Sequence, residues 1–116
     1  MHIISRTIIE DFCRRNAHYA ERCYAWFSLV ETLDWRKPKD MVDSFGDKAV
    51  DILGKWKNKN TDRVVFDLGG NEVRIIARYV FHPKLKRCRL YLKWIGNHAE
   101  YDKLCDNNLQ YTVEKR

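Results

Sequence analysis

The sequence contains no long apolar run, and this absence argues against a membrane-spanning helix. No window of the 116 residues approaches the roughly 20 apolar residues that a membrane-spanning helix needs. The opening stretch, MHIISRTIIEDFCRR, also lacks an apolar segment of signal-peptide length. We therefore expect a protein that stays in the cytoplasm, where it is made.

Paired cysteines and clusters of metal-binding side chains are also missing. The four cysteines (Cys13, Cys23, Cys88 and Cys105) lie in unrelated segments and form no Cys-x-x-Cys pair. This spacing favours the free thiols of a cytosolic protein, although a disulfide or a metal site stays open as an alternative. We expect no metal and no other cofactor.

Linker composition is absent as well. The chain has 5 glycines and 2 prolines, no internal repeat, and no long segment rich in Pro, Gly or Ser. Its hydrophobic content of 45% and its charges of mixed sign are typical of a folded protein. A chain of this length buries roughly two-thirds of its unfolded surface, so residues 1–116 are predicted to form one domain.

Basic charge is present, and it is concentrated in the second half of the chain. Residues 1–54 carry 8 Lys/Arg against 9 Asp/Glu, whereas residues 55–116 carry 14 against 7, which together give the net charge of +6. This asymmetry favours a polyanion or an acidic partner that contacts one part of the surface. A generally basic, soluble surface is the alternative.

The first half has the periodicity of helices that follow a short strand at residues 2–5. Thr7-x-x-Glu10 matches a capping box and precedes a helix with Ile8, Ile9, Phe12 and Cys13 on one face. A second helix follows, and the two are expected to form a hairpin. Its apolar stripe has spacings of 4, 3, 4 and 3 and consists of Tyr19, Cys23, Trp26, Val30 and Leu33.

A short third helix is predicted between Pro38, which suits a first helical turn, and Gly46, which suits a C-terminal cap. From Arg63 onward the period changes to two. RVVFDL and NEVRIIARYVF flank Gly69-Gly70 as a β-hairpin, and a turn at residues 82–86 leads to a third strand, RCRLYLKWI. The predicted fold is α+β, with the helices on one face of a small antiparallel sheet.

Alternation within RCRLYLKWI, the last strand of the predicted meander, divides its side chains between two faces. Cys88, Leu90, Leu92 and Trp94 are predicted to face the helices. The opposite face is expected to be exposed and basic, with one aromatic ring, and to carry Arg63, Asp67, Arg74, Arg78, Arg87, Arg89, Tyr91 and Lys93.

Such a surface suits single-stranded RNA, because cations follow the phosphates while bases stack on aromatic rings. Just before the first strand, GKWKNKN adds a loop with Lys55, Trp56, Lys57 and Lys59. The alternative for the sheet is an ordinary solvated face with long side chains, and for the loop an ordinary solvated turn.

The stretch KWIGNHAEYDKL places His98 and Tyr101 just after the third strand. RNA supplies its own nucleophile, the 2′-hydroxyl, so a ribonuclease needs only a base, an acid and cationic support for the phosphorane. Histidine titrates near neutral pH, and a tyrosine beside Arg could act as acid or base if its pKa were lowered. A surface histidine and a helix N-terminus that favours Glu100 and Asp102 are the structural alternatives.

These residues carry a family resemblance that covers most of the chain. RVVFDLGGNEVRII and the later YLKWIGNHAEYDKL resemble the HigB branch of the RelE-like toxins, whose members show R-V-V-F-N-I-x-G-N-x-Y-R-L and G-T-H-x-E-Y-D-K segments. Trp35-x-x-Pro38 resembles the W-x-x-P segment of that family. This chain departs from the pattern at Asp67 for Asn, at Val73 for an aromatic residue, and at Asn97 for Thr.

The resemblance implies a ribosome-dependent mRNA endonuclease that acts as the toxin of a toxin–antitoxin pair. Its partners are then mRNA on the ribosome and a helix-turn-helix, HigA-like antitoxin. By position, the motif residues are Arg63, Arg74, His98, Glu100, Tyr101 and Asp102, of which we expect Arg74, His98 and Tyr101 to be catalytic. A binding module of the same fold, which contacts RNA or the ribosome without cleavage, is the alternative.

Overall fold

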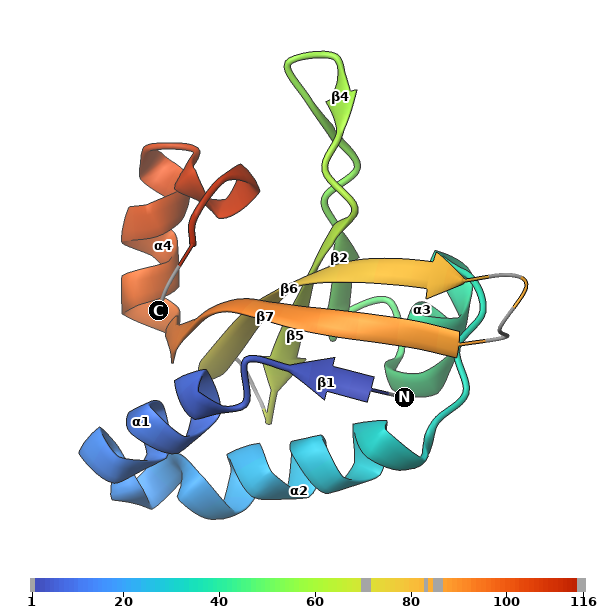
Figure 1. The fold of residues 1–116 in the computed structure, drawn as a ribbon. Coiled ribbons are helices and arrows are strands. Elements are labelled where there is room, and N and C mark those ends of the chain that lie inside the picture. The colour runs from blue at the N-terminus through green and yellow to red at the C-terminus, as the bar shows by residue number, and fades with distance from the viewer. Residues whose placement is uncertain (1, 70–71, 83, 85–86, 115–116) are drawn as a thin grey trace.

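A computed structural model describes residues 2–69, 72–82, 84 and 87–114 of the protein (Figure 1). Two short 3-10 helices, η1 and η2, accompany the α-helices and strands. The elements in chain order are β1 (His2–Ile4), α1 (Thr7–Arg15), η1 (Ala17–Tyr19), α2 (Ala20–Thr32), α3 (Pro38–Phe45), β2 (Val50–Ile52), β3 (Lys55–Trp56), β4 (Lys59–Asn60), β5 (Arg63–Leu68), β6 (Val73–His82), β7 (Arg87–Asn97), α4 (His98–Asp106) and η2 (Leu109–Tyr111).

The main sheet has five strands in the order β1-β7-β6-β5-β2. The predicted meander of β5, β6 and β7 is confirmed, and so is the α+β class. The sheet is mixed rather than antiparallel throughout, because β1 runs parallel to β7 at one edge. We did not predict β2 at the other edge, since three residues are too few to establish a period of two. Within the predicted turns, Gly70, Pro83, Leu85 and Lys86 lie outside the described residues.

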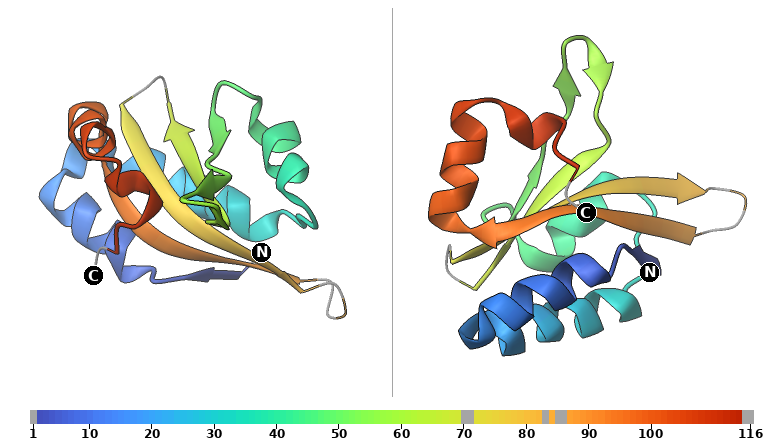
Figure 2. Two further views of the ribbon diagram at one scale, coloured as in Figure 1. Left: turned by 90° about the horizontal axis from the view of Figure 1, so that it is seen from above. Right: turned by 60° about the vertical axis from the view of Figure 1, so that its left-hand side comes forward.

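Helices α1 and α2 lie side by side against one face of the sheet, as predicted (Figures 1 and 2). Their apolar stripes meet β5, β6 and β7 in the main core, where Phe12, Val30 and Leu90 are at most 2% exposed. Trp35, from the W-x-x-P segment, stacks on Phe66 with 5.8 Å between ring centroids. Burial of these large apolar side chains is the dominant stabilising contribution to such a core. That residues 1–116 form one domain stays a prediction.

The helix termini were predicted with mixed success. Helix α3 begins at Pro38 and is closed by Gly46 at a φ of 90°, as expected. The predicted capping box at Thr7 is wrong, because Thr7 already lies within α1 and Arg6 is the capping position without a side-chain cap. Glu10 instead forms an ion pair with Arg6, with 3.3 Å between Nε and Oε1.

No helix among the described residues is both long enough and apolar enough to cross a membrane.

A β-bulge in β7 changes which face the end of the strand presents. Ile76 is in register with Trp94, but the next residue, Ala77, is in register with Leu92, so Lys93 is an extra residue. One extra residue reverses a period of two. Leu92 therefore faces the main core as predicted, whereas the prediction that Trp94 shares this face is wrong.

Candidate active site

Helix α4 covers part of the sheet face opposite α1 and α2 (Figure 1). Beneath it lies a second, smaller core, in which the side chains of Val65, Ile76, Trp94 and Tyr101 are each at most 8% exposed. Val113, from the segment that follows α4, packs against the same cluster. The predicted open basic face is therefore wrong in its central part, where an apolar cluster lies under α4 and the C-terminal segment.

Arg63 shows the consequence for the predicted RNA-binding residues. It lies on the predicted face, but its side chain is only 6% exposed. Its guanidinium donates hydrogen bonds to the carbonyl oxygens of Gln110 (3.3 Å) and Val113 (2.8 Å) and to Oε1 of Glu114 (3.0 Å). Burial lowers the pKa of Arg63, and the nearby Glu114 opposes this effect. The expectation that Arg63 is exposed is thus wrong.

Other predicted basic residues remain accessible toward the far end of β6 and β7. Arg78 and Arg87 are exposed, and Arg89, Tyr91 and Lys93 are half-buried. Arg78 and Tyr91 are partners in the β6–β7 register, which places a cation beside the aromatic ring. The open basic surface is therefore not at the centre of the sheet, as predicted, but toward the end where β6 finishes and β7 begins, which we call the β6–β7 end.

The stretch KWIGNHAEYDKL contains the junction of β7 and α4. Asn97 caps the helix: its side chain accepts a hydrogen bond from the Glu100 backbone at 2.8 Å, and Glu100 Oε1 accepts one from Asn97 N at 2.9 Å. This reciprocal pair is a capping box, so the structural role considered for Glu100 at the helix N-terminus is confirmed, and Asn97, which stands where the family has Thr, is the capping residue. His98 is the first residue of α4 and lies at the surface, with Nε2 3.5 Å from Oδ2 of Asp102.

Tyr101, one turn further along α4, meets Arg74 of β6. The guanidinium carbon lies 5.1 Å from the centroid of the tyrosine ring, within the range of a cation–π interaction. Arg74 Nε is also 3.7 Å from Oδ1 of Asp67, which is the carboxylate that replaces the family's Asn. The structure therefore brings Arg74 and Tyr101 together, and that these two residues are catalytic stays a prediction.

A small cavity of about 130 Å³ adjoins this pair. Tyr101 and Arg74 form part of its lining, but His98 is not among the described residues that surround it. The complete lining is Lys48, Ala49, Val50, Asp51, Val65, Asp67, Arg74 and Tyr101. Lys48 and Asp51 were missed in the sequence, because they belong to the region of β2, whose strand had no recognisable pattern.

The protonation of Tyr101 follows from its surroundings. Burial raises the pKa of Tyr101, and Cys105 and Asp51 raise it further, whereas Arg74 alone lowers it. The phenol therefore keeps its proton at neutral pH and can donate a hydrogen bond or a proton. Burial also raises the pKa of Asp51, against the opposing effect of Arg74. A lowered tyrosine pKa, which a role as base would need, is not found.

Lys55, Lys57 and Lys59 lie on a β-hairpin arm formed by β3 and β4, which projects from the sheet (Figure 1). The predicted loop is wrong in this respect, because Lys57 and Asn58 both adopt positive φ and form a tight two-residue turn. Trp56 stacks on Tyr111 of η2, with 4.5 Å between centroids and 3° between ring planes. The arm is therefore held against the C-terminal segment.

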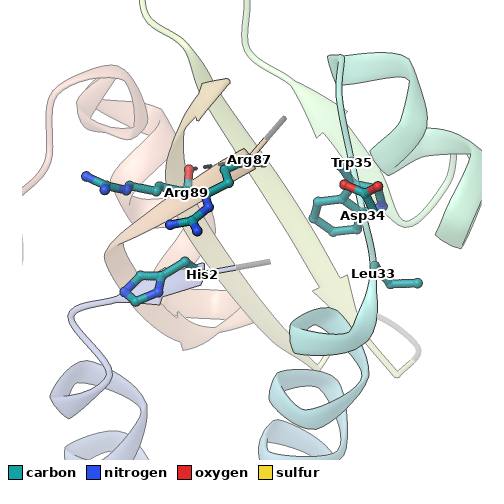
Figure 3. Close-up of a pocket in the computed structure, with 7 residues that line it drawn as sticks. His2, Leu33, Asp34, Trp35, Arg87 and Arg89 are labelled. Carbon is teal, nitrogen blue, oxygen red and sulfur yellow. Dashed lines mark hydrogen bonds between the residues drawn. The ribbon is translucent and has the colours of Figure 1, made fainter. Parts of the chain in front are cut away.

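A larger cavity of about 320 Å³ lies at the β1 edge of the sheet (Figure 3). His2, Arg87 and Arg89 gather on one wall, and Leu33, Asp34 and Trp35 lie across from them. Its lining shares no residue with the cavity beside Arg74 and Tyr101. Two of the predicted RNA-binding arginines therefore belong to a different part of the surface from the predicted catalytic residues.

The alternatives of a metal site and a disulfide concern side chains in the described part of the chain. No group of three or more His, Cys, Asp or Glu residues is placed there to hold a metal ion. All four cysteines are free thiols. Burial raises the pKa of Cys23 and of Cys88 to about 12, so these two thiols are protonated and act as packing residues.

Gly96 is predicted to be necessary for the geometry of this site. An added Cβ would lie 2.4 Å from Cη2 of Trp94, whose ring packs against Tyr101. Gly96→Ala is expected to lower the free energy of unfolding by about 1–3 kcal/mol, as overpacking does in a rigid site. Chemical denaturation measures this loss. Trp94→Phe removes the part of the ring that clashes, so adding Gly96→Ala to that variant is expected to cost much less; equal costs in both backgrounds would contradict the explanation.

Comparison with known proteins gives consistent matches. A family model described as HigB_toxin, the RelE-like toxic component of a toxin–antitoxin system, matches residues 19–104. The chain is 35% identical over 104 residues to the mRNA interferase HigB of Escherichia coli O6:H1 strain CFT073. This alignment covers 90% of this chain and 91% of that protein. It is also 24% identical over 102 residues to the mRNA interferase toxin HigB of Escherichia coli K12, and that alignment covers 88% of each of the two proteins.

Proposed function

The chain belongs to the HigB toxin family, the RelE-like toxic components of toxin–antitoxin systems, and from this membership we propose that it is a ribosome-dependent mRNA endonuclease. The relatives named mRNA interferase support the activity. The observation that carries the assignment to a site is the contact of Arg74 with Tyr101 beside a cavity at the start of α4. The proposed substrate places the protein's action in the cytoplasm.

In the proposed reaction, the 2′-oxygen of the RNA attacks the adjacent phosphorus while the bond from phosphorus to the 5′-oxygen breaks. A base removes the 2′-hydroxyl proton, an acid protonates the departing 5′-oxygen, and the products are a 2′,3′-cyclic phosphate and a 5′-hydroxyl. No metal ion takes part in this scheme. Hydrolysis of the cyclic product would leave a 3′-phosphate.

The surroundings of each side chain support separate roles. The permanently charged Arg74 would stabilise the negative charge of the phosphorane. Tyr101, which holds its proton, would donate a hydrogen bond or a proton. His98 is then the residue for proton removal, with Asp102 as the carboxylate that orients its imidazole. Tyr101 and His98 are three positions apart on α4, so the first turn of one helix would supply both groups.

The accessible cations would hold the rest of the RNA. We assign this role to the exposed arm and to the β6–β7 end of the sheet, where Tyr91 could stack on a base. The residues involved are Lys55, Lys57, Lys59, Arg78, Arg87, Arg89, Tyr91 and Lys93. A helix-turn-helix antitoxin of the HigA kind is the proposed neutralising partner.

Expression of this chain alone and together with the adjacent reading frame tests the function directly. We expect growth arrest from the chain alone, rescue by an antitoxin encoded next to it, and new mRNA 5′ ends inside translated frames. Harmless expression without new 5′ ends would instead favour the binding module that does not cleave RNA.

The proposed phosphate contacts also predict a dependence on salt. Binding to programmed ribosomes or to single-stranded RNA should weaken steeply as the salt concentration rises, because each phosphate contact releases counterions. The expected slope of log K against log salt is about −0.7 for each phosphate neutralised on a single strand. A titration over several salt concentrations measures it, and an affinity that does not change with salt would indicate an uncharged protein partner instead.

A further inference from the structure

Glu114, near the C-terminal end, bridges two cations that belong to different strands. Its Oε1 lies 3.0 Å from a terminal nitrogen of Arg63 in β5, and its Oε2 lies 2.8 Å from Nζ of Lys93 in β7. Lys93 is the extra residue of the β-bulge in β7. Through Glu114 it shares an anionic partner with Arg63. Two carboxylate oxygens thus occupy a position defined by a guanidinium and an ammonium group.

The cations are far more enclosed than the carboxylate that joins them. The side chains of Arg63 and Lys93 are 6% and 19% exposed, whereas that of Glu114 is 57% exposed. The backbone carbonyls of Gln110 and Val113 fix the other side of the guanidinium. Only the Glu114 side chain has to rotate into solvent for both cations to accept another anion, while the buried guanidinium stays in place.

A buried guanidinium requires an anionic partner, because an uncompensated charge in a poorly solvated position is costly. A guanidinium fork beside an ammonium group suits a phosphate as well as a carboxylate, since each offers two oxygens at similar spacing. Only the carboxylate of Glu114 is largely solvated, and a phosphate in its place would keep the two enclosed cations paired. Glu114 is therefore an anion that a phosphate group could replace at small cost.

The surrounding segment lies on the face of the sheet that carries Arg74 and Tyr101. Val113 packs into the small core that contains Tyr101, and Tyr111 stacks on Trp56 of the β3–β4 arm. Figure 2 shows this segment between α4 and the arm. The family match ends at residue 104, so this segment lies beyond the matched region. A phosphate bound at Arg63 and Lys93 would thus lie between the catalytic residues and the basic arm.

We propose that Arg63 and Lys93 form a binding subsite for an RNA backbone phosphate, which the carboxylate of Glu114 occupies until RNA displaces it. This inference rests on the proposed function, because RNA is taken as the ligand. It gives Arg63 a role in RNA binding despite its burial. It also makes the C-terminal segment a competitor of the substrate, so that the negative charge at Glu114 lowers the affinity for RNA.

Glu114→Gln tests the proposal, with Glu21→Gln on α2 as a control that makes the same change of charge on the opposite side of the sheet. We expect Glu114→Gln to bind a single-stranded RNA of about 12 nucleotides roughly fivefold more tightly than wild type at low salt, and Glu21→Gln to bind it as wild type does. Glu114→Asp, whose shorter side chain keeps the charge, should give an intermediate affinity. Equal binding by Glu114→Gln and Glu21→Gln would overturn the proposal.

Inorganic phosphate supplies a second measurement that does not depend on RNA cleavage. Adding phosphate should raise the melting temperature of Glu114→Gln more than that of wild type, because the ligand stabilises the folded state that binds it. The difference should disappear when Lys93→Met is added to both proteins. A phosphate response that is the same with and without Glu114 would overturn the subsite.

The two proposals fail in different ways. If wild type cuts mRNA on ribosomes but Glu114→Gln gains no affinity for RNA or phosphate, the subsite is wrong and the endonuclease function stands. If phosphate stabilises Glu114→Gln selectively but no variant binds or cuts RNA, the anion site is real and its assignment to RNA is overturned together with the proposed function.

Discussion

His98→Ala is expected to slow mRNA cleavage on programmed ribosomes by roughly 10²- to 10⁴-fold, which is the usual contribution of general acid–base catalysis. The imidazole would be the group that removes the 2′-hydroxyl proton, and Asp102 lies 3.5 Å from it. His98 is at the surface, so its loss should leave ribosome binding and stability nearly unchanged. Single-turnover cleavage measures the chemical step apart from binding.

Arg74→Ala and Tyr101→Phe complete the same experiment. Loss of one preorganised charge commonly costs about 10²-fold or more, and this is expected for Arg74. Arg74 forms an ion pair with Asp67, so Arg74→Ala alone also leaves the Asp67 carboxylate without that guanidinium. The double variant Arg74→Ala with Asp67→Asn removes both charges and is the matched control for this side effect. Tyr101→Phe keeps the ring against Arg74 and removes only the hydroxyl, so a large rate loss assigns it a proton or hydrogen-bond role and a small loss assigns it to packing.

Wild-type cleavage rates for both His98→Ala and Tyr101→Phe would contradict the assignment of this site. The exposed residues Lys55 and Lys57 and the half-buried Arg89 would then be the next candidates. Ribosome binding by each variant has to be measured in the same assay, because a rate loss that follows weaker binding says nothing about proton transfer.

Leu92→Asp is expected to unfold the protein. Leu92 is 2% exposed in the main core, and a carboxylate there would be buried without a compensating charge, at a cost of several kcal/mol that is comparable to the stability of a small domain. Thermal melting followed by circular dichroism measures the loss. Arg89→Ser, on the opposite face of the same strand, is the control and should melt close to wild type. Equal melting temperatures for Leu92→Asp and wild type would contradict the assignment of strand faces.

The elements with strong periodicity could be predicted from the sequence. The stripe of α2 and the alternation of β5 to β7 each follow from side chains that have to reach one core, so the pattern and the burial agree for residues such as Cys23 and Leu90. The capping role of Glu100 could also be predicted, because it depends on local spacing alone. These features depend on neighbours close in the chain.

The errors arise where distant parts of the chain meet. Nothing in the alternation of β7 indicates that Lys93 is a bulge, so the change of face at Trp94 could not be predicted. The burial of Arg63 depends on a segment that follows it by 47 to 51 positions and has no pattern of its own. The pairing of Asp67 with Arg74 could be anticipated from the register, whereas the approach of Tyr101 to Arg74 depends on how α4 packs.

The parallel pairing of β1 with β7 has a consequence for the kinetics of folding. Residues 2–4 find their partners at residues 89–91, so the pairing closes a loop of about three quarters of the chain. Contacts of such long sequence separation have a high entropic cost and slow the folding of small proteins. The hairpin of β5 and β6 can form locally, but β1 has to wait until β7 is in place. Among the described strands, β1 comes first in the chain and is nevertheless among the last to be paired.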